Sequence, residues 1–171
     1  MRFRSLVLLT TLALSFGIGR AADVAEEIQK KVAVMTEAFF KGDFEKQIDL
    51  MPPKILELVG GREKMLAVLK RETAAMEANQ MKVQSYEVGA PVQIVESDGT
   101  TFALMPSTLT LKTPTVKATK KSHVLGIGDG KGGWSFLRTE QGEEKVRLIV
   151  PNLPATMKIP APQKPTIEKL P

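Results

Sequence analysis

The chain has 171 residues and no cysteine, which excludes a disulfide scaffold, a thiolate zinc site, a cysteine nucleophile and a lipid attached through an N-terminal cysteine. Hydrophobic residues make up 43% and charged residues 25% of the chain, a balance that is ordinary for one globular domain and excludes a disordered protein or a coiled coil. The formal net charge of +5 raises the question of a nucleic-acid partner.

The first 21 residues have the pattern of a secretory signal peptide. Two arginines within Met1–Arg4 precede an uncharged, leucine-rich run over Ser5–Phe16, and Gly19 and Ala21 stand at the small-residue positions of a cleavage site. The apolar run is shorter than the roughly 18 to 20 residues that a membrane-spanning helix needs. We therefore expect cleavage after Ala21, export to the periplasm or the exterior, and no membrane anchor.

Most of the basic excess lies at the two ends of the chain. Three arginines belong to the predicted signal peptide, and the last 21 residues add three lysines against one glutamate, so residues 22–150 are balanced in charge. The strand-like region contains one basic stretch without an acid or an aromatic residue, and it consists of Lys112, Lys117, Lys120 and Lys121. Single-stranded nucleic acid binding would need aromatic stacking platforms. The stretch favours a solvated strand face, with an acidic envelope polymer as the alternative partner, and the sequence predicts no nucleic-acid binding.

Three helical segments follow the predicted signal peptide. Residues Asp23–Lys41 carry an apolar stripe at spacings of three and four, which predicts a helix with a capping box at its start and a stop at Gly42. Asp43 is placed to cap a short second helix that ends before Pro52 and Pro53, after which the chain makes one further helical turn. A third helix is predicted over Arg62–Asn79. The stripe of the first helix consists of Val24, Ile28, Val32, Met35 and Phe39.

From Met81 onward the hydrophobic period approaches two, which predicts strands. The dipeptide Asp98-Gly99 lies between two of them and indicates a hairpin. In the longest strand the apolar parity changes around Pro106, and we expect a β-bulge there that bends the strand. The predicted strands are Lys82–Val88, Val92–Glu96, Thr101–Lys112, Thr115–Ile127 and Trp134–Thr139.

The last segment, residues 151–171, is a proline-rich tail. Six of the eleven prolines lie there, and this density opposes a packed helix or a central strand. We expect the tail to follow the body up to about Ile159 and to be free beyond it.

Helices followed by an antiparallel meander predict an α+β domain over residues 22–150, with the N-terminal helices packed on a curved sheet. The helices, the Phe39–Phe44 junction and the terminal strand Gly132–Leu137 together resemble the NTF2-like, cystatin-like cone superfamily, and in particular its exported, uncharacterised bacterial members. The resemblance implies a conical pocket between sheet and helices and a homodimer formed through the outer face of the sheet. The superfamily contains enzymes, transport factors and binding modules, so the fold does not choose a function.

The glycine-rich run before the last strand does not indicate a dinucleotide site. Gly128, Gly130 and Gly133 have the G-x-G-x-x-G spacing, but a strand follows where a phosphate-binding loop needs a helix N-terminus. This run is predicted to be a hairpin loop. One histidine and no cysteine leave only carboxylates to hold a metal, so we expect no metal site and no cofactor.

The resemblance implies that an acid or base would lie in the cone as Tyr, Asp or His. The chain offers Tyr86 and His123, and Trp134 is a further aromatic that an apolar ligand could contact. We predict these three as ligand-binding residues, although each would also serve as a packing residue. No catalytic residue is assigned, because two of the pocket strands contain no carboxylate. A general base would have to be one of Glu87, Glu96, Asp43, Asp49 and Glu57.

Three functions agree with these features. The first is an exported, soluble NTF2-like protein that binds a small apolar ligand or acts as an accessory or interaction module, as a homodimer. The second is a cone-pocket isomerase or dehydratase that uses acid/base catalysis through His123 or Tyr86 on a small hydrophobic substrate. The third is a structural envelope module that works through its sheet face and proline-rich tail.

Overall fold

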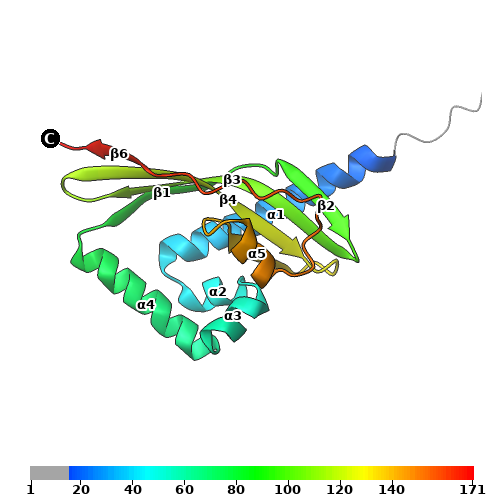
Figure 1. The fold of residues 1–171 in the computed structure, drawn as a ribbon, viewed down its shortest axis with the longest axis horizontal. Coiled ribbons are helices and arrows are strands. Elements are labelled where there is room, and N and C mark those ends of the chain that lie inside the picture. Colours follow the sequence, from blue (N-terminus) through cyan, green and yellow to red (C-terminus); the bar gives the residue numbers. More distant parts are fainter. Residues whose placement is uncertain (1–15) are drawn as a thin grey trace, which may run out of the picture.

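The computed structural model of the protein describes residues 16–171, with side chains from Asp23 onward, so most of the predicted signal peptide lies outside the described residues. Four helices come first and an antiparallel sheet follows, with one further helix before the last strand (Figure 1). The predicted α+β class, with N-terminal helices packed on a curved antiparallel sheet, is confirmed. The elements are α1 (Phe16–Lys41), α2 (Phe44–Asp49), α3 (Pro53–Val59), α4 (Arg62–Ala78), β1 (Lys82–Val88), β2 (Gln93–Ser97), β3 (Thr100–Lys112), β4 (Val116–Gly128), β5 (Trp134–Arg138), α5 (Glu143–Ile149) and β6 (Thr166–Lys169).

The predicted first helix is confirmed, and it starts earlier than expected. Helix α1 begins at Phe16 and not at Asp23, because no proline interrupts the intervening residues. Asp23 and Glu26 are therefore interior residues of the helix and do not form a capping box at its start. The apolar stripe faces the sheet as predicted, and Ile28 and Val32 on it are buried.

Helices α2, α3 and α4 turn the chain back toward the sheet. Asp43 caps α2 as predicted, and its Oδ1 accepts a hydrogen bond from the backbone N–H of Lys46 at 3.0 Å. Pro52 and Pro53 occupy the N-cap and first position of α3, where a missing N–H has no cost to the helix. Gly60 ends α3 with a φ of +93°, which glycine adopts without strain.

Strands β3 and β4 form the spine of the sheet. Each has 13 residues, and they pair in antiparallel fashion without a register shift from Thr101–Gly128 to Lys112–Lys117. Their neighbours are short: β2 and β1 share the edge of β3, and β6 and β5 share the edge of β4. The five strands predicted from the sequence agree with β1–β5 within one residue at every end.

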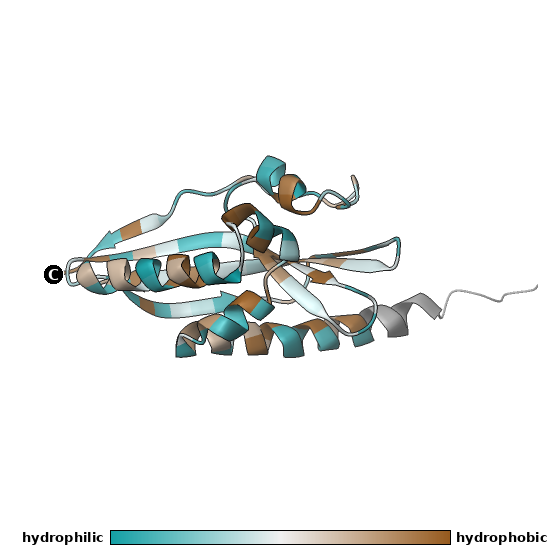
Figure 2. Ribbon diagram, turned by 90° about the horizontal axis from the view of Figure 1, so that it is seen from below, coloured by the Kyte–Doolittle hydropathy of each residue, from teal (hydrophilic) through white to brown (hydrophobic). Residues whose placement is uncertain are grey.

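Both faces of this sheet are covered. The inner face packs against α1, and the outer face packs against α5 and the chain that follows it; Figure 2 shows these two layers on opposite sides of the strands. The inner cluster consists of Ile28, Val32, Tyr86, Ala103, Met105, Leu109, Val124 and Phe136. The outer cluster consists of Phe102, Leu104, Leu125, Leu137, Val146, Val150, Leu153, Met157 and Ile159.

The bulge predicted at Pro106 is wrong. The β3–β4 register is continuous, and the change of apolar parity has another cause: Phe102 and Leu104 lie on the outer face, whereas Leu109 lies on the inner face, and each half of β3 meets a different covering layer. The carbonyl of Pro106 accepts from the Gly89 N–H at 2.8 Å, at the junction where β1 ends and β2 has not begun. The N–H and C=O of a strand residue point to the same side, so the N–H that proline lacks would face the same junction. The strand tolerates Pro106 for this reason.

The start of the predicted tail belongs to the core. Residues 150–159, called here the C-terminal segment, follow α5 directly. They place three buried side chains of the tail, Leu153, Met157 and Ile159, on the outer face. The Arg147 guanidinium fixes the path of this segment, because it donates to the carbonyls of Leu153 and Met157 at 2.9 and 3.0 Å.

The tail also returns to the sheet where a free end was expected. Thr166–Lys169 forms β6 and pairs with the first half of β4, and the N–H of Leu170 donates to the carbonyl of Thr115 at 2.8 Å (Figure 1). The physical reason is that β5 pairs only with Val124–Gly128, which leaves the first part of the β4 edge open, and β6 pairs with four positions there, Val116–Thr119. The residues between Pro165 and Pro171 have the N–H groups that this edge requires.

Replacing Met157, which is fully buried, tests whether the C-terminal segment contributes to stability. We expect Met157→Ala to lower the free energy of unfolding by about 2 to 5 kcal/mol, because it opens a cavity under the outer face. Leu148→Ala, at an exposed position of α5, is the matched control and should change the free energy of unfolding by about 0.5 kcal/mol or less. Urea unfolding measures both, and equal effects of the two variants would contradict a packed segment.

Candidate functional site

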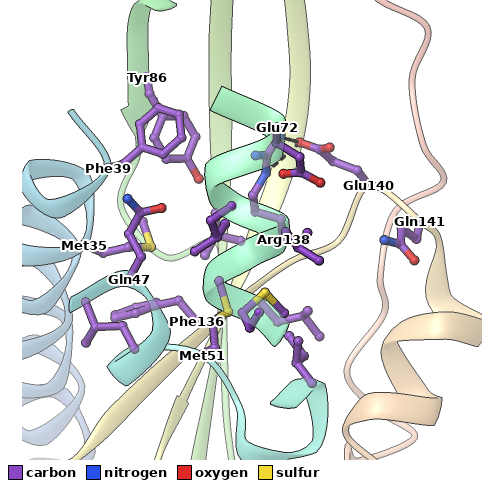
Figure 3. Close-up of a pocket in the computed structure, with 17 residues that line it drawn as sticks. Met35, Phe39, Gln47, Met51, Glu72, Tyr86, Phe136, Arg138, Glu140 and Gln141 are labelled. Carbon is purple, nitrogen blue, oxygen red and sulfur yellow. Dashed lines mark hydrogen bonds and ion pairs between the residues drawn. The ribbon is translucent and has the colours of Figure 1, made fainter. Parts of the chain in front are cut away.

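A cleft of about 510 Å³ lies between the helices and the inner face of the sheet. Its wall is mainly apolar. The polar side chains of Glu72, Arg138, Glu140 and Gln141 gather toward the end of β5 (Figure 3). The apolar lining consists of Met35, Phe39, Leu50, Met51, Ile55, Met65, Val68, Leu69, Val124, Phe136 and Leu137, and the polar lining of Gln47, Glu72, Tyr86, Arg138, Glu140 and Gln141. A concave apolar site with a few polar groups is the usual form of a small-molecule site.

Tyr86 is the polar residue that lies deepest in this cleft. Its side chain is 9% exposed, and its ring packs against that of Phe39 with the ring centroids 5.2 Å apart. In Figure 3 its hydroxyl points into the space between α1 and Arg138. The hydroxyl oxygen is buried and has no hydrogen-bond partner among residues 16–171. Buried hydroxyls normally have a partner, so this group is the exception in the wall that requires an explanation.

A cluster of charges stands beside Tyr86. Arg138 donates from Nε to Glu140 at 3.0 Å and from Nη2 to the same oxygen, and Lys120 donates to the other oxygen of Glu140 at 3.2 Å. The guanidinium carbon of Arg138 lies 6.0 Å from the centre of the Tyr86 ring, within the range of a cation–π contact. Both cations are therefore occupied by one carboxylate, and Glu72 of α4 adds a second negative charge to the wall.

The surroundings set the protonation of both acidic groups. Burial raises the pKa of the Tyr86 phenol above its ordinary value, and the nearby positive charge of Arg138 only partly offsets this, so at neutral pH the hydroxyl is protonated and can donate. Burial also acts to raise the pKa of Glu140. The charges and hydrogen bonds of Arg138 and Lys120 outweigh that effect and hold it below the ordinary value, so Glu140 is ionised.

The three predicted ligand-binding residues do not come together. Tyr86 lines the cleft, whereas His123 alternates with the inner-face residue Val124 and therefore lies on the outer face, where burial lowers its pKa. Trp134 is on the inner face but outside the cleft lining, and its Nε1–H donates to Glu27 of α1 at 2.8 Å. Trp134 thus ties α1 to the sheet.

The five carboxylates considered as general bases do not line the cleft either. Asp43 caps α2, Asp49 pairs with Arg62 at 2.7 Å and Glu57 pairs with Lys54 at 2.7 Å, while Glu87 and Glu96 are exposed on β1 and β2.

Sequence reasoning missed the two carboxylates that do line the cleft, Glu72 and Glu140. A signal for Glu140 was present, because Arg138 and Glu140 are two residues apart at the end of a strand and so share a face. No comparable signal marks Glu72, which reaches the cleft because α4 crosses its open side (Figure 3).

Two other predicted features have structural roles. The run Gly128–Gly133 is a hairpin loop, as expected, in which Asp129 accepts from the N–H groups of Lys131 and Gly133 at 2.8 and 2.9 Å. Lys117 pairs with Glu168 of β6 at 3.8 Å, and Lys121 is exposed on the outer face. Within residues 16–171 no group of three acidic or histidine side chains is placed to hold a metal ion, and no helix is long and apolar enough to cross a membrane.

The chain matches no protein-family model, and it has no significant match among curated proteins or solved structures. The geometry of the cleft is therefore the basis for assigning a function.

Glu140 is expected to make folding stability pH-dependent. Its folded-state pKa lies below the ordinary value of 4.5, so the stabilisation is fully present above about pH 4.5 and is lost as the pH falls through the lowered folded-state value. Glu140→Gln should lower the free energy of unfolding by about 1 kcal/mol at pH 7 and by much less at pH 3. Urea unfolding at both pH values measures this.

The matched control is Glu144→Gln, since Glu144 is exposed on α5. A loss of stability in Glu140→Gln that is the same at pH 3 and pH 7 would contradict the ion-pair cluster.

Proposed function

We propose that the protein is an exported, NTF2-like small-ligand-binding protein whose ligand occupies the inner cleft and accepts a hydrogen bond from Tyr86. The observation that carries the proposal is the buried hydroxyl of Tyr86, which has no partner among the described residues and belongs to a residue that lines a mainly apolar cleft. The volume of about 510 Å³ falls in the range of small-molecule sites.

The unpaired hydroxyl of Tyr86 destabilises the unliganded protein. A buried donor without an acceptor costs about 1 to 3 kcal/mol, and a phenylalanine ring at this position would avoid that cost. An acceptor atom on a ligand would recover the lost hydrogen bond in surroundings with little competing water. Because burial keeps the phenol protonated at neutral pH, Tyr86 is suited to donate to such an atom.

Binding is favoured over acid/base catalysis. Among the described residues no carboxylate lies within hydrogen-bond distance of the Tyr86 hydroxyl, and His123 is on the opposite face of the sheet from the cleft. The carboxylate whose charge acts on Tyr86, Glu140, is ionised and already held by Arg138 and Lys120, an arrangement that suits a fixed wall better than a base that must accept a proton.

The homodimer remains part of the proposal. The apolar half of the outer face is covered by the C-terminal segment, so a second copy would contact the polar half, where Lys117, Thr119 and Lys121 lie. Native mass spectrometry of the purified chain reads the mass of the assembly and of any copurified ligand in one measurement.

Replacing Tyr86 by phenylalanine separates the contribution of its hydroxyl to stability from its proposed contribution to ligand binding. We expect Tyr86→Phe to leave the unliganded protein as stable as the wild type or up to about 1 kcal/mol more stable, since the hydroxyl satisfies no partner. The same variant should copurify with less ligand. Urea unfolding of the ligand-free protein measures the stability, and native mass spectrometry measures the copurified ligand.

Trp134→Phe is the control for this experiment. It removes a hydrogen bond to Glu27 and should cost about 1 kcal/mol of stability while ligand occupancy is unchanged. Occupancy that is equal in Tyr86→Phe and the wild type would contradict the proposed function.

Export is tested by expression of the full chain in a Gram-negative host. We expect the protein in the periplasmic fraction with Ala22 as its first residue, measured by intact mass. Ala21→Arg should block this cleavage, and a chain that stays full-length in the cytoplasm would contradict export.

A further inference from the structure

A second cleft of about 210 Å³ lies next to the first, between α3 and α5. The two share four lining residues, Ile55, Leu137, Arg138 and Gln141, so they adjoin along the end of β5. The second cleft is lined further by Leu58, Val59, Val146 and Ile149, with Lys145 as its additional polar residue. Apolar wall therefore continues from the first cleft past Leu137 and between the two helices.

The strand register places Tyr86 and Arg138 on different rows of the sheet. Tyr86 is aligned through Leu109 with Lys120, whereas Arg138 is aligned with Val124, and these rows are four residues apart along β4, about 13 Å between backbones at the usual rise of a strand. The Arg138 side chain extends back toward Tyr86, so that its guanidinium carbon lies 6.0 Å from the centre of the Tyr86 ring. A molecule that reaches from Tyr86 into the second cleft must pass Arg138 and Leu137, which line both clefts, and is therefore elongated.

The charges of the wall decide the polarity of such a molecule. Tyr86 supplies a neutral donor, and Arg138, whose guanidinium carbon lies 6.0 Å from the centre of the Tyr86 ring, is held by Glu140. Glu72 and Glu140 both line the first cleft. A ligand carboxylate placed at Tyr86 would therefore meet negative charge, and the lining of the first cleft offers it no unpaired cation. An uncharged acceptor, such as an ester carbonyl, has no such conflict.

We propose that the two clefts form one site for a neutral long-chain acyl compound, with its ester carbonyl at Tyr86 and its hydrocarbon chain running past Leu137 into the second cleft. This inference rests on the proposed function and adds the class of ligand. Leu58 fits it independently: this side chain lines the second cleft and is 56% exposed, an exposure that a hydrocarbon chain would reduce.

The test compares three probes on the purified, delipidated chain by isothermal titration calorimetry: methyl octanoate, methyl dodecanoate and dodecanoic acid. We expect methyl dodecanoate to bind at least tenfold more tightly than methyl octanoate, because its additional methylene groups reach the second cleft. It should also bind more tightly than dodecanoic acid. Tyr86→Phe should weaken both esters by a similar factor, about five- to tenfold.

The decisive variant is Leu58→Trp, which fills the second cleft from an exposed position. It should abolish the gain from the longer chain and leave methyl octanoate unchanged. Leu148→Trp is the matched control, since Leu148 is 65% exposed on α5 and lines neither cleft, and it should alter neither affinity. Thermal unfolding of both variants confirms that they fold.

The outcomes separate the inference from the proposed function. If both esters bind through Tyr86 with equal affinity, or if Leu58→Trp keeps the gain, the acyl-chain site is overturned while the small-ligand function stands. Tighter binding of dodecanoic acid than of its ester overturns the uncharged ligand class. If neither ester binds, the inference fails, and the occupancy of Tyr86→Phe decides the proposed function separately.

Discussion

The structure depends on the antiparallel pairing of β3 and β4 along their full length. Because side chains alternate between the faces of this two-strand spine, each strand presents apolar residues to both sides, Phe102 and Leu125 to the outer layer and Met105 and Val124 to α1. A sheet with two apolar faces needs two covering layers. The N-terminal helices supply one, and the C-terminal segment supplies the other.

This division explains why the cleft exists where it does. Helix α1 packs directly on the inner face, while α2, α3 and α4 form the opposite wall of the cleft that lies over Val124, Phe136 and Tyr86. On the outer face the C-terminal segment fills the corresponding space with Leu153, Met157 and Ile159. The two faces thus differ: the outer face is packed with side chains of the C-terminal segment, and the inner face keeps a cleft beside Tyr86, whose hydroxyl has no partner among residues 16–171.

Much of the fold could be predicted because the signals are local. The alternation of apolar residues fixes the strands, Asp98-Gly99 has positive φ at both residues as a tight hairpin requires, and Asp43 caps α2 through its own side chain. The prediction of a bulge at Pro106 was wrong for a non-local reason. Parity alone cannot distinguish a strand that switches faces from a strand whose two faces are covered by different parts of the chain.

The sequence by itself determined the order and type of the elements from α1 to β5, the balanced charge of residues 22–150 and the presence of Tyr86 on a strand, since these follow from spacing and composition. Only the tertiary structure decided that the Tyr86 hydroxyl lacks a partner within residues 16–171, that His123 lies on the other face, and that Glu72 and Glu140 reach the same cleft. The reason is that these relations join α4, β1, β4 and β5, and side-chain contacts between segments so far apart in the chain depend on how the layers pack.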